Sequence, residues 1–273
     1  MLKLYPLFSG SGGNSTYIEF ENKKGILVDI GKSAKKIHDA LRARNISVNN
    51  VKAIFITHEH TDHISGLKVF ISKYNPDVKI FGSAGTIGSM RKSGYLTDKN
   101  NVFEIKNNQV DLEFVQMKSF SISHDCAEGL GYTFTSKSGS QAAICTDLGY
   151  ISKDVQSNLK GSNVVVMESN HDVMMLQNGR YPYFLKRRIL SDNGHLSNDT
   201  CGKFLPFLVK NGTKNIILSH LSEHNNIPDL ALQTSKYYLE QEGMTIEKDF
   251  HLSASSKEVP PENFHIIKSP LDS

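Results

Sequence analysis

Short apolar runs bounded by turn residues dominate the first sixty positions of the chain. Runs of this kind, rich in branched and aromatic side chains, predict β-strands at residues 3–8, 16–20, 26–30 and 53–57. Residues 21–25, Glu-Asn-Lys-Lys-Gly, separate two of these runs and predict a hairpin turn. Residues 33–44 interrupt the strands, and there we expect a helix.

The rest of the chain continues the mixture of strands and helices. Further short runs predict strands at residues 79–82, 102–105, 112–115, 131–135, 142–146, 164–168 and 215–219. We expect helices at residues 65–74, 184–190, 198–211 and 228–242. This many short strands implies two sheets, and helices able to cover both favour a four-layer αββα sandwich of the α/β (α+β) class. The pattern alone leaves other layered arrangements open.

Composition is that of a single folded unit with a substantial core. The 273 residues are 38% hydrophobic and 22% charged, without a dividing linker or repeat, so we expect one domain over residues 1–273. The apolar opening at residues 1–8 is too short for an export signal or a membrane helix. The three cysteines are too few and too scattered for a disulfide framework. These features predict a cytoplasmic protein with no membrane contact.

Four side chains that can bind metals follow directly after the strand predicted at residues 53–57. They are His58, His60, Asp62 and His63. A loop at the end of a buried strand can turn several side chains toward one point, and imidazole and carboxylate groups are ligands for Zn, Mn or Fe. The alternative is a solvated polar loop, but ligand-type residues this close together favour a metal site.

The pattern His-x-His-x-Asp-His after a strand resembles the signature of the metallo-β-lactamase superfamily. Its other motifs occur in the same order, with Asp29 in Leu-Val-Asp-Ile-Gly, His124 in Ser-His-Asp, Asp147 in Thr-Asp-Leu-Gly and His220 in Ser-His-Leu. The resemblance implies that His58, His60 and His124 hold one metal, that Asp62, His63 and His220 hold another, and that Asp147 bridges them. Two divalent metals so placed activate water for hydrolysis, which also makes Asp62 and Asp147 catalytic.

Two residue types near these motifs have an ordinary structural alternative. The resemblance implies that Asp29 orients a ligand histidine, whereas a turn aspartate can also cap a backbone amide. Cys126 and Cys145 lie two residues from proposed ligands. We interpret them as small buried thiols and leave them outside the site.

A closer resemblance, to the YycJ/WalJ group of bacterial metallo-β-lactamase-fold proteins, extends over nearly the whole chain. It is carried by residues 7–15, 167–172, 181–189, 194–198 and 218–222. Gly12 departs from it, because that group more often has serine there. The resemblance implies a 5′-to-3′ exonuclease acting on double-stranded DNA.

The same segments contain candidates for catalysis and for substrate binding. By similarity to the tRNA-maturing nuclease branch, His195 donates a proton or hydrogen bond to the leaving group and Glu168 orients it; the alternative is that His195 caps the helix starting near Ser197. The basic run Lys186, Arg187 and Arg188 is expected to contact DNA phosphates, although such runs are more often solvated faces. Asn170 and His171 are expected to line the same cleft.

Three functions remain open at this point. The leading one is a DNA phosphodiesterase with two divalent metals. A hydrolase of a small phosphodiester or thioester, or an RNA or tRNA nuclease, keeps the same fold and metals, and the modest formal net charge of +3 supports a small substrate. A protein that binds metal and nucleic acid without turnover is disfavoured, because every ligand position is filled.

Overall fold

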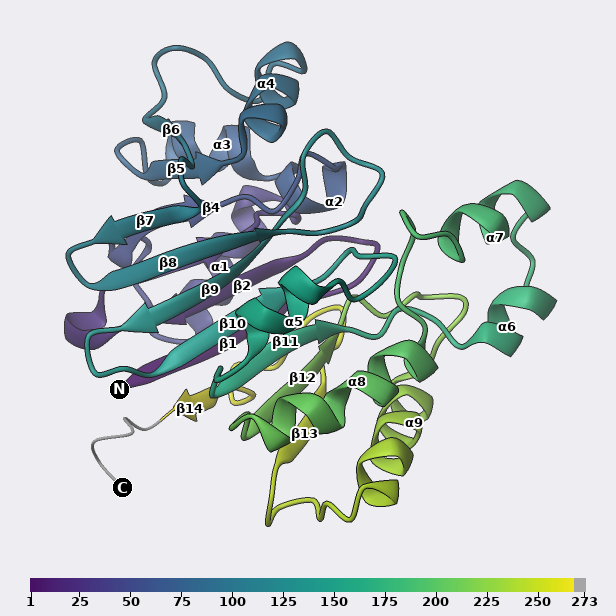
Figure 1. Cartoon of the computed structure of the whole chain (residues 1–273). Helices are drawn as coiled ribbons and strands as arrows, with labels where there is room; N and C mark the ends of the chain where they lie inside the picture. Colours follow the sequence, from purple (N-terminus) through teal and green to yellow (C-terminus); the bar gives the residue numbers. More distant parts are fainter. Residues whose placement is uncertain (268–273) are drawn as a thin grey trace.

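Two seven-stranded β-sheets form the centre of the structure, a computed structural model that describes residues 1–267 (Figure 1). The first sheet has the order β14-β1-β2-β3-β4-β5-β6, formed by β1 (Leu2–Phe8), β2 (Ser15–Glu19), β3 (Gly25–Val28), β4 (Val51–Phe55), β5 (Lys79–Gly82), β6 (Val102–Glu104) and β14 (His265–Ile267). The second has the order β13-β12-β11-β10-β9-β8-β7, formed by β7 (Gln109–Leu112), β8 (Val115–Ser121), β9 (Leu130–Ser136), β10 (Gln141–Cys145), β11 (Val164–Glu168), β12 (Asn215–Ser219) and β13 (His251–Ala254).

Helices flank the two sheets, and most of them cover an outer face. They are α1 (Ala34–Ala43), α2 (Thr61–Ile64), α3 (Leu67–Lys73), α4 (Ala84–Lys92), α5 (Lys153–Leu159), α6 (Val173–Asn178), α7 (Tyr183–Ile189), α8 (Asn198–Lys210) and α9 (Pro228–Gln241), with short 3₁₀ turns η1 (Glu21–Lys23) and η2 (Val48–Asn50). Apolar residues of α1, α3 and α4 form one core with the first sheet, and those of α5, α8 and α9 form another with the second. A third core lies between the sheets. The predicted four-layer αββα sandwich is therefore confirmed.

The strands show why a continuous apolar run marks a central strand. Along β4, Ala53 and Phe55 contribute to the core between the sheets, whereas Ile54 contributes to the core under the helices. Successive side chains of a strand point to opposite faces, so a strand covered on both faces needs apolar residues at every position. Phe55 stacks on Phe81 at a centroid distance of 4.9 Å and meets Phe134 of the second sheet edge-on at 5.2 Å.

The helices begin where the sequence supplies caps. The Ser33 side chain accepts a hydrogen bond from the backbone of Lys36, and α1 then buries Ala34, Ile37 and Leu41 on one face. The predicted helices at residues 33–44, 65–74, 184–190, 198–211 and 228–242 correspond to α1, α3, α7, α8 and α9. The turn predicted at residues 21–25 connects the antiparallel strands β2 and β3.

One predicted strand is wrong, and several elements were not predicted. Residues 112–115 were expected to form one strand, but they span the turn of the β7–β8 hairpin, where Leu112 pairs with Val115 across Glu113 and Phe114. Neither turn residue is a typical turn former, so the apolar pattern gave no sign of the break. Helices α2, α4, α5 and α6 and strands β13 and β14 were also missed, and α2 replaces part of the loop expected at residues 58–63.

The parallel strands determine where a site can form. Strands β3 to β6 run parallel in the first sheet, and β10 to β13 run parallel in the second. In such sheets, ligands bind beyond the carboxyl ends of the strands. Across residues 1–267, no helix combines the length and the apolarity needed to cross a bilayer. The last six residues of the domain expected over 1–273 lie outside the described residues.

Candidate active site

The predicted metal ligands and the two acids expected to orient histidines follow or end strands in both sheets. In the first sheet, Asp29 follows β3 directly, and the loop containing His58 follows β4. In the second, Asp147 follows β10, Glu168 is the last residue of β11, and His220 follows β12. Residues far apart in the sequence therefore meet where the two sheets end.

Three of these residues have an unusual backbone conformation. Asp29, Asp147 and His220 have φ angles of 61°, 60° and 57°, in the left-handed region. Side chains other than glycine are uncommon there, with aspartate and histidine among the better tolerated. Each residue immediately follows or lies two positions beyond a strand end, so the left-handed turn redirects the chain sharply at the site. Strain of this kind concentrates at functional sites.

His58, His60 and His124 form the first group of potential ligands. One nitrogen of each lies within 4.8 Å of the others, and His58 Nε2 is 3.1 Å from His60 Nδ1. His58 is fully buried, and burial together with the neighbouring His63 holds its pKa well below the usual range for histidine. A neutral imidazole is the form that binds a metal.

Asp62, His63 and His220 form the second group, again within 4.8 Å. The Asp62 carboxylate lies 3.5 Å from His63 Nε2 and 3.6 Å from His220 Nε2. Asp147 lies between the two groups, because its carboxylate is 3.4 Å from His63 Nε2 and 4.0 Å from His124 Nε2. The structure thus brings all seven predicted ligands together.

Unsatisfied polar atoms indicate that this cluster fits cations. Asp147 Oδ2 and His220 Nε2 are buried and make no hydrogen bond to any described residue. Buried polar atoms without hydrogen bonds are costly, and a cation bound between these two side chains would satisfy both. Although burial lowers the pKa of His220, the carboxylates of Asp147, Asp62 and Glu168 raise it to about 10. That excess of carboxylate charge around a histidine is what a bound cation neutralises.

Asp29 connects the first sheet to the ligand cluster. Its Oδ2 is 2.8 Å from His63 Nδ1, and it also accepts hydrogen bonds from the backbone N and the Oγ1 of Thr57, both at 2.8 Å. The two roles considered for Asp29, orienting a histidine and capping a backbone amide, therefore occur together. With Nδ1 engaged, His63 directs Nε2 toward Asp62 and Asp147.

Glu168 holds two histidines rather than the one expected. Its Oε1 lies 2.8 Å from Nδ1 of both His195 and His220. Its Oε2 accepts backbone hydrogen bonds from Leu148 and Leu196. Burial alone would raise the pKa of Glu168, but these two histidines hold it well below its usual range. The capping residue of α8 is Ser197, whose side chain accepts from the backbone of Thr200, so the helix-cap alternative for His195 is wrong.

The glycine-rich loop at residues 9–15 supports the ligands, a role that sequence reasoning missed. Ser9 Oγ accepts from the backbone N of His220 at 2.8 Å, and Asn14 Nδ2 lies 3.0 Å from His63 Nε2. Gly10 and Gly13 have φ angles of 107° and 137°, which require glycine. Gly12 lies outside the left-handed region, so the backbone there accepts a side chain such as serine. The glycine-rich motif could have indicated that this loop matters, but it did not indicate which ligand residues the loop contacts.

A cavity of about 270 Å³ opens over the cluster. Ligand-type side chains form part of its lining, namely His60, Asp62, His124, Asp147, His195 and His220. Another part comes from the segment that includes α7, through Tyr181, Leu185, Arg188 and Ile189. Asn170, predicted to bind substrate, also lines the cavity and donates from Nδ2 to the His220 carbonyl at 2.8 Å.

The other predicted substrate contacts lie at different distances from this cavity. His171 is buried, its pKa is lowered to about 4 by burial, and it is not part of the lining. Arg188 lines the cavity and pairs with Asp125. Lys186 and Arg187 belong to the same helix but lie outside the lining. Among the described residues, no cysteine belongs to a ligand group.

Comparison with known proteins gives the class first. The family model described as a β-lactamase superfamily domain matches residues 25–221. The metallo-β-lactamase fold protein YhfI from Bacillus subtilis superimposes with a TM-score of 0.70 at 15% identity, covering 94% of this chain and 97% of that one. The structural likeness agrees with the two packed sheets.

Two curated relatives narrow the class. Exodeoxyribonuclease YycJ of Bacillus anthracis is 36% identical over 93% of this chain and 95% of its own length. Exodeoxyribonuclease WalJ of Streptococcus pneumoniae is 37% identical over 92% of this chain and 93% of its own. The chain therefore belongs to the β-lactamase superfamily, in the family that includes these two proteins.

Proposed function

We propose that this chain is a metal-dependent exodeoxyribonuclease that degrades duplex DNA from 5′ to 3′. The observation that carries the proposal is the similarity to two exodeoxyribonucleases over more than nine-tenths of each chain. A ligand cluster beneath an open cavity supplies the chemistry. The three cysteines are free in the structure, and we propose that the protein works in the cytoplasm as one domain.

Two divalent cations, Zn, Mn or Fe, fit the cluster. His58, His60 and His124 would hold one, Asp62, His63 and His220 the other, and Asp147 would contact both. When bound, such a pair activates water as the nucleophile and offsets the negative charge that develops on the phosphate. Asp29, Glu168 and Ser9 keep the ligand histidines in place through the contacts described above.

His195 is proposed to supply the leaving-group proton. It lines the cavity, and its Nδ1 is fixed by Glu168 at 2.8 Å, which leaves Nε2 for the substrate. Arg188, Lys186 and Arg187 would supply positive charge for the DNA backbone, and Asn170 and His171 would support the cleft.

Labelled DNA tests this proposal directly. Manganese-loaded protein should release mononucleotides from the 5′ ends of a DNA duplex. It should act much more slowly on RNA, a cyclic dinucleotide or a generic phosphodiester. Elemental analysis should find about two equivalents of metal per chain. Faster hydrolysis of the cyclic dinucleotide than of DNA would replace this proposal with the small-substrate alternative. A stoichiometry of one, unchanged by Asp62→Ala, would overturn the dinuclear site.

A further inference from the structure

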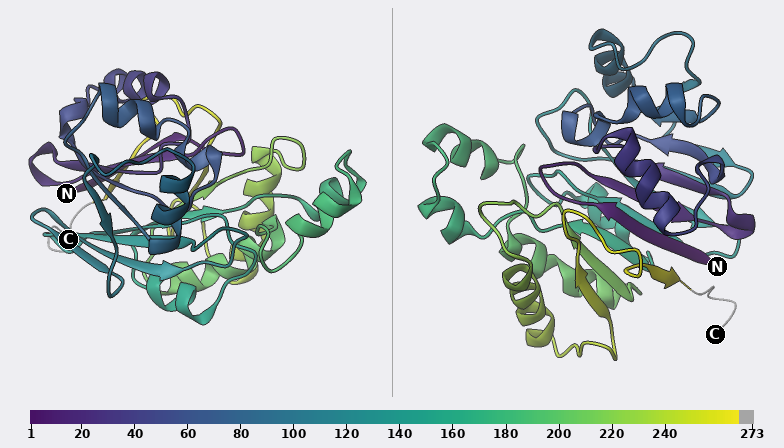
Figure 2. Two further views of the ribbon diagram at one scale, coloured as in Figure 1. Left: turned by 90° about the horizontal axis from the view of Figure 1, so that it is seen from above. Right: turned by 180° about the vertical axis from the view of Figure 1, so that it is seen from behind.

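Helices α6 and α7 form an arm (residues 173–190) that projects beyond the ends of the sheets (Figures 1 and 2). Its α7 contributes Leu185, Arg188 and Ile189 to the catalytic cavity. Residues three and four positions apart share one face of a helix, so a single face of α7 is directed to the cavity. The remaining surface of α7 therefore lies beside the entrance to the site.

Two aromatic rings stand in solvent on this arm. Tyr183 and Phe184 are 76% and 75% exposed, more than any other large hydrophobic side chain of residues 1–267. Single exposed apolar residues are ordinary on protein surfaces. Two adjacent exposed rings next to a catalytic cavity are different, because aromatic residues gain much from burial and are enriched where proteins bind partners.

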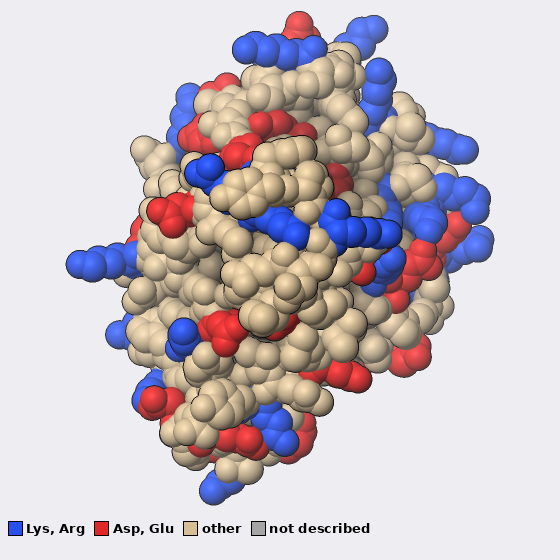
Figure 3. Space-filling view, turned by 90° about the vertical axis from the view of Figure 1, so that its right-hand side faces the viewer, with Lys and Arg blue, Asp and Glu red and all other residues tan. Residues whose placement is uncertain are grey.

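Positive charge without an acidic partner accompanies the rings. The Arg187 guanidinium lies 6.0 Å from the centroid of the Tyr183 ring, and Lys186 Nζ donates to the backbone carbonyl of Gln177 at 2.8 Å. Neither makes an ion pair with a described residue, unlike Lys36, which pairs with Glu258. Figure 3 looks onto the end of the molecule from which the arm projects, and there Lys and Arg side chains lie beside uncharged surface.

The size of the cavity restricts how DNA can reach the metals. About 270 Å³ falls just below the range of roughly 300–1,000 Å³ that small-molecule sites occupy. A cavity of this size takes a nucleotide-sized unit and not a duplex. We therefore place an unpaired terminal nucleotide in the cavity, and leaving the duplex costs that nucleotide its base stacking.

We propose that Tyr183 and Phe184 stack the unpaired bases of the strand that enters the cavity. This inference rests on the proposed function and names the feature of DNA that the arm recognises. Aromatic rings beside cations bind single strands without regard to sequence, because every base has a stacking face and every nucleotide has a phosphate. The unpaired cations favour a polyanion over an apolar protein segment as the occupant.

The effect should appear in binding as well as in cleavage. Loss of a stacking ring lowers affinity for single strands by about tenfold or more. We expect that loss for the double variant Tyr183→Ala/Phe184→Ala, and near wild-type affinity for the conservative Tyr183→Phe/Phe184→Tyr. Tyr237→Ala provides the matched control, since Tyr237 is 56% exposed on α9, next to Lys236 and away from the cavity lining.

Fluorescence anisotropy with a labelled single-stranded oligodeoxynucleotide tests stacking without any need for cleavage. The oligonucleotide is compared with one that lacks bases at its two 5′-terminal positions, in EDTA. Wild-type protein should bind the abasic strand about tenfold more weakly. The alanine double variant should bind both strands equally, at the weaker affinity. Equal binding of the two strands by wild-type protein would overturn the inference, and would leave the arm as a surface for another protein.

Cleavage of the corresponding duplexes separates this inference from the proposed function. Absence of DNA hydrolysis by metal-loaded wild-type protein would count against the function, whatever the anisotropy shows. Normal hydrolysis with a kcat/KM equally insensitive to terminal bases and to the alanine variants would count against stacking alone. Circular dichroism and thermal melting must show that the double variant is folded, and the aromatic exchange variant tests the same point independently.

Discussion

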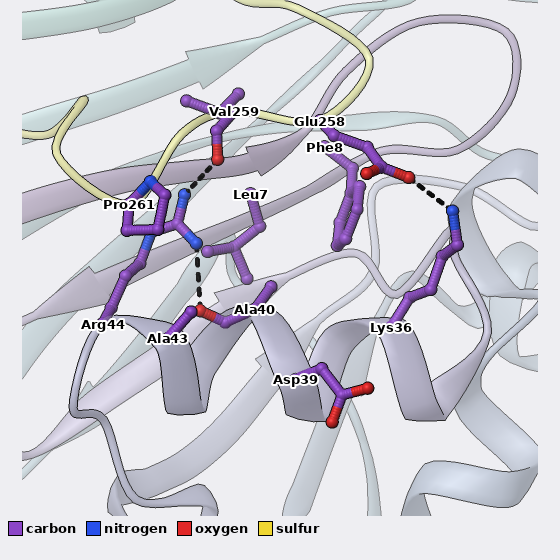
Figure 4. A pocket seen from close by; sticks show the side chains of 10 residues that line it. All are labelled: Leu7, Phe8, Lys36, Asp39, Ala40, Ala43, Arg44, Glu258, Val259 and Pro261. Carbon is purple, nitrogen blue, oxygen red and sulfur yellow. Dashed lines mark hydrogen bonds and ion pairs between the residues drawn. The ribbon is translucent and has the colours of Figure 1, made fainter.

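Two cavities of similar size lie in very different chemical surroundings. The catalytic cavity measures about 270 Å³, and a second cavity of about 230 Å³ lies between α1 and residues 258–261 near the C-terminus (Figure 4). In the second, Lys36 pairs with Glu258, and Arg44 donates to the backbone carbonyls of Ala40 and Val259 at 2.9 and 2.6 Å. Its charges are thus satisfied largely by the chain itself.

The catalytic cavity lacks this internal balance. Asp147 Oδ2 and His220 Nε2 are buried without hydrogen bonds to described residues, whereas around α1 only Arg44 Nε has no such bond among the lining groups. The other two nitrogens of the same guanidinium donate hydrogen bonds to backbone carbonyls. Volume therefore does not identify a site. What distinguishes the catalytic cavity is that its two buried atoms without hydrogen bonds belong to one group of ligand-type side chains, where a bound cation can satisfy both.

The largest effect should come from removing the carboxylate between the two ligand groups. We expect Asp147→Ala to lose far more activity than the roughly 10–100-fold typical of losing an outer partner of a metal ligand, with the fold retained. Steady-state cleavage of labelled duplex and a thermal melt measure both. Asp39→Ala removes a carboxylate from the α1 cavity and should leave the rate unchanged. Comparable rates for Asp147→Ala and wild-type protein would contradict the assigned role.

His195→Ala should come next, with a fall in turnover of about 10²–10⁴-fold and little change in DNA affinity. A group that donates to the leaving oxygen acts mainly in the transition state, so kcat falls more than binding. The double variant Lys186→Ala/Arg187→Ala should do the opposite, weakening affinity and flattening its salt dependence. His38→Ala, whose ring stacks on Tyr74, is the control. A lower affinity with unchanged turnover in His195→Ala would assign that histidine to binding.

The two ligand groups should respond differently to pH. Burial lowers the pKa of His63 and His220, but the adjacent carboxylates, Asp147 foremost, more than reverse this and keep both pKa values above the usual histidine range. Burial lowers the pKa of His58 and of His124, and both pKa values stay below that range. Cation binding must therefore displace protons from the His63 and His220 group and not from the other.

The displaced protons determine whether cation affinity rises or falls with pH. Below the pKa of about 10 for His220 in metal-free protein, affinity at its group should rise with pH, by roughly tenfold per unit for each displaced proton. The group that contains His58 and His124, whose pKa values are lowered, should gain much less affinity as the pH rises. Competition titrations with a chromophoric chelator at several pH values resolve two affinities. Parallel pH dependence of both would show that the groups do not differ in this way.

Local sequence patterns were sufficient to predict most of the strands and helices, and the motifs identified the seven ligands. The six-residue stretch from His58 to His63 and the strand before it were sufficient to predict a metal site, because residues this close in sequence stay close in space, although Asp62 and His63 lie on α2 and not on the expected loop. The contacts that hold the ligands were harder to predict. Glu168 reaches His220 across 52 positions, and Ser9 reaches the same residue across 211. Such pairs depend on how the two sheets pack, which no local pattern encodes.

The smallest effect on activity should come from the α1 cavity. Arg44 is half-buried and donates to the carbonyls of Val259 and Pro260, so it ties residues 258–261 to the helix. Arg44→Ala should lower the free energy of unfolding by about 1.5–3 kcal/mol, the range for hydrogen bonds to a charged group, because the carbonyls lose their donor. Denaturant titration measures this loss.

The rate of DNA cleavage per folded molecule should stay at the wild-type value in this variant, because the α1 cavity shares no lining residue with the catalytic one. Arg44→Lys, which keeps the charge but not the fork of donors, should recover part of the stability. A fall in turnover at unchanged stability would contradict the comparison of the two cavities. It would show that the α1 cavity influences the catalytic centre despite its internally satisfied charges.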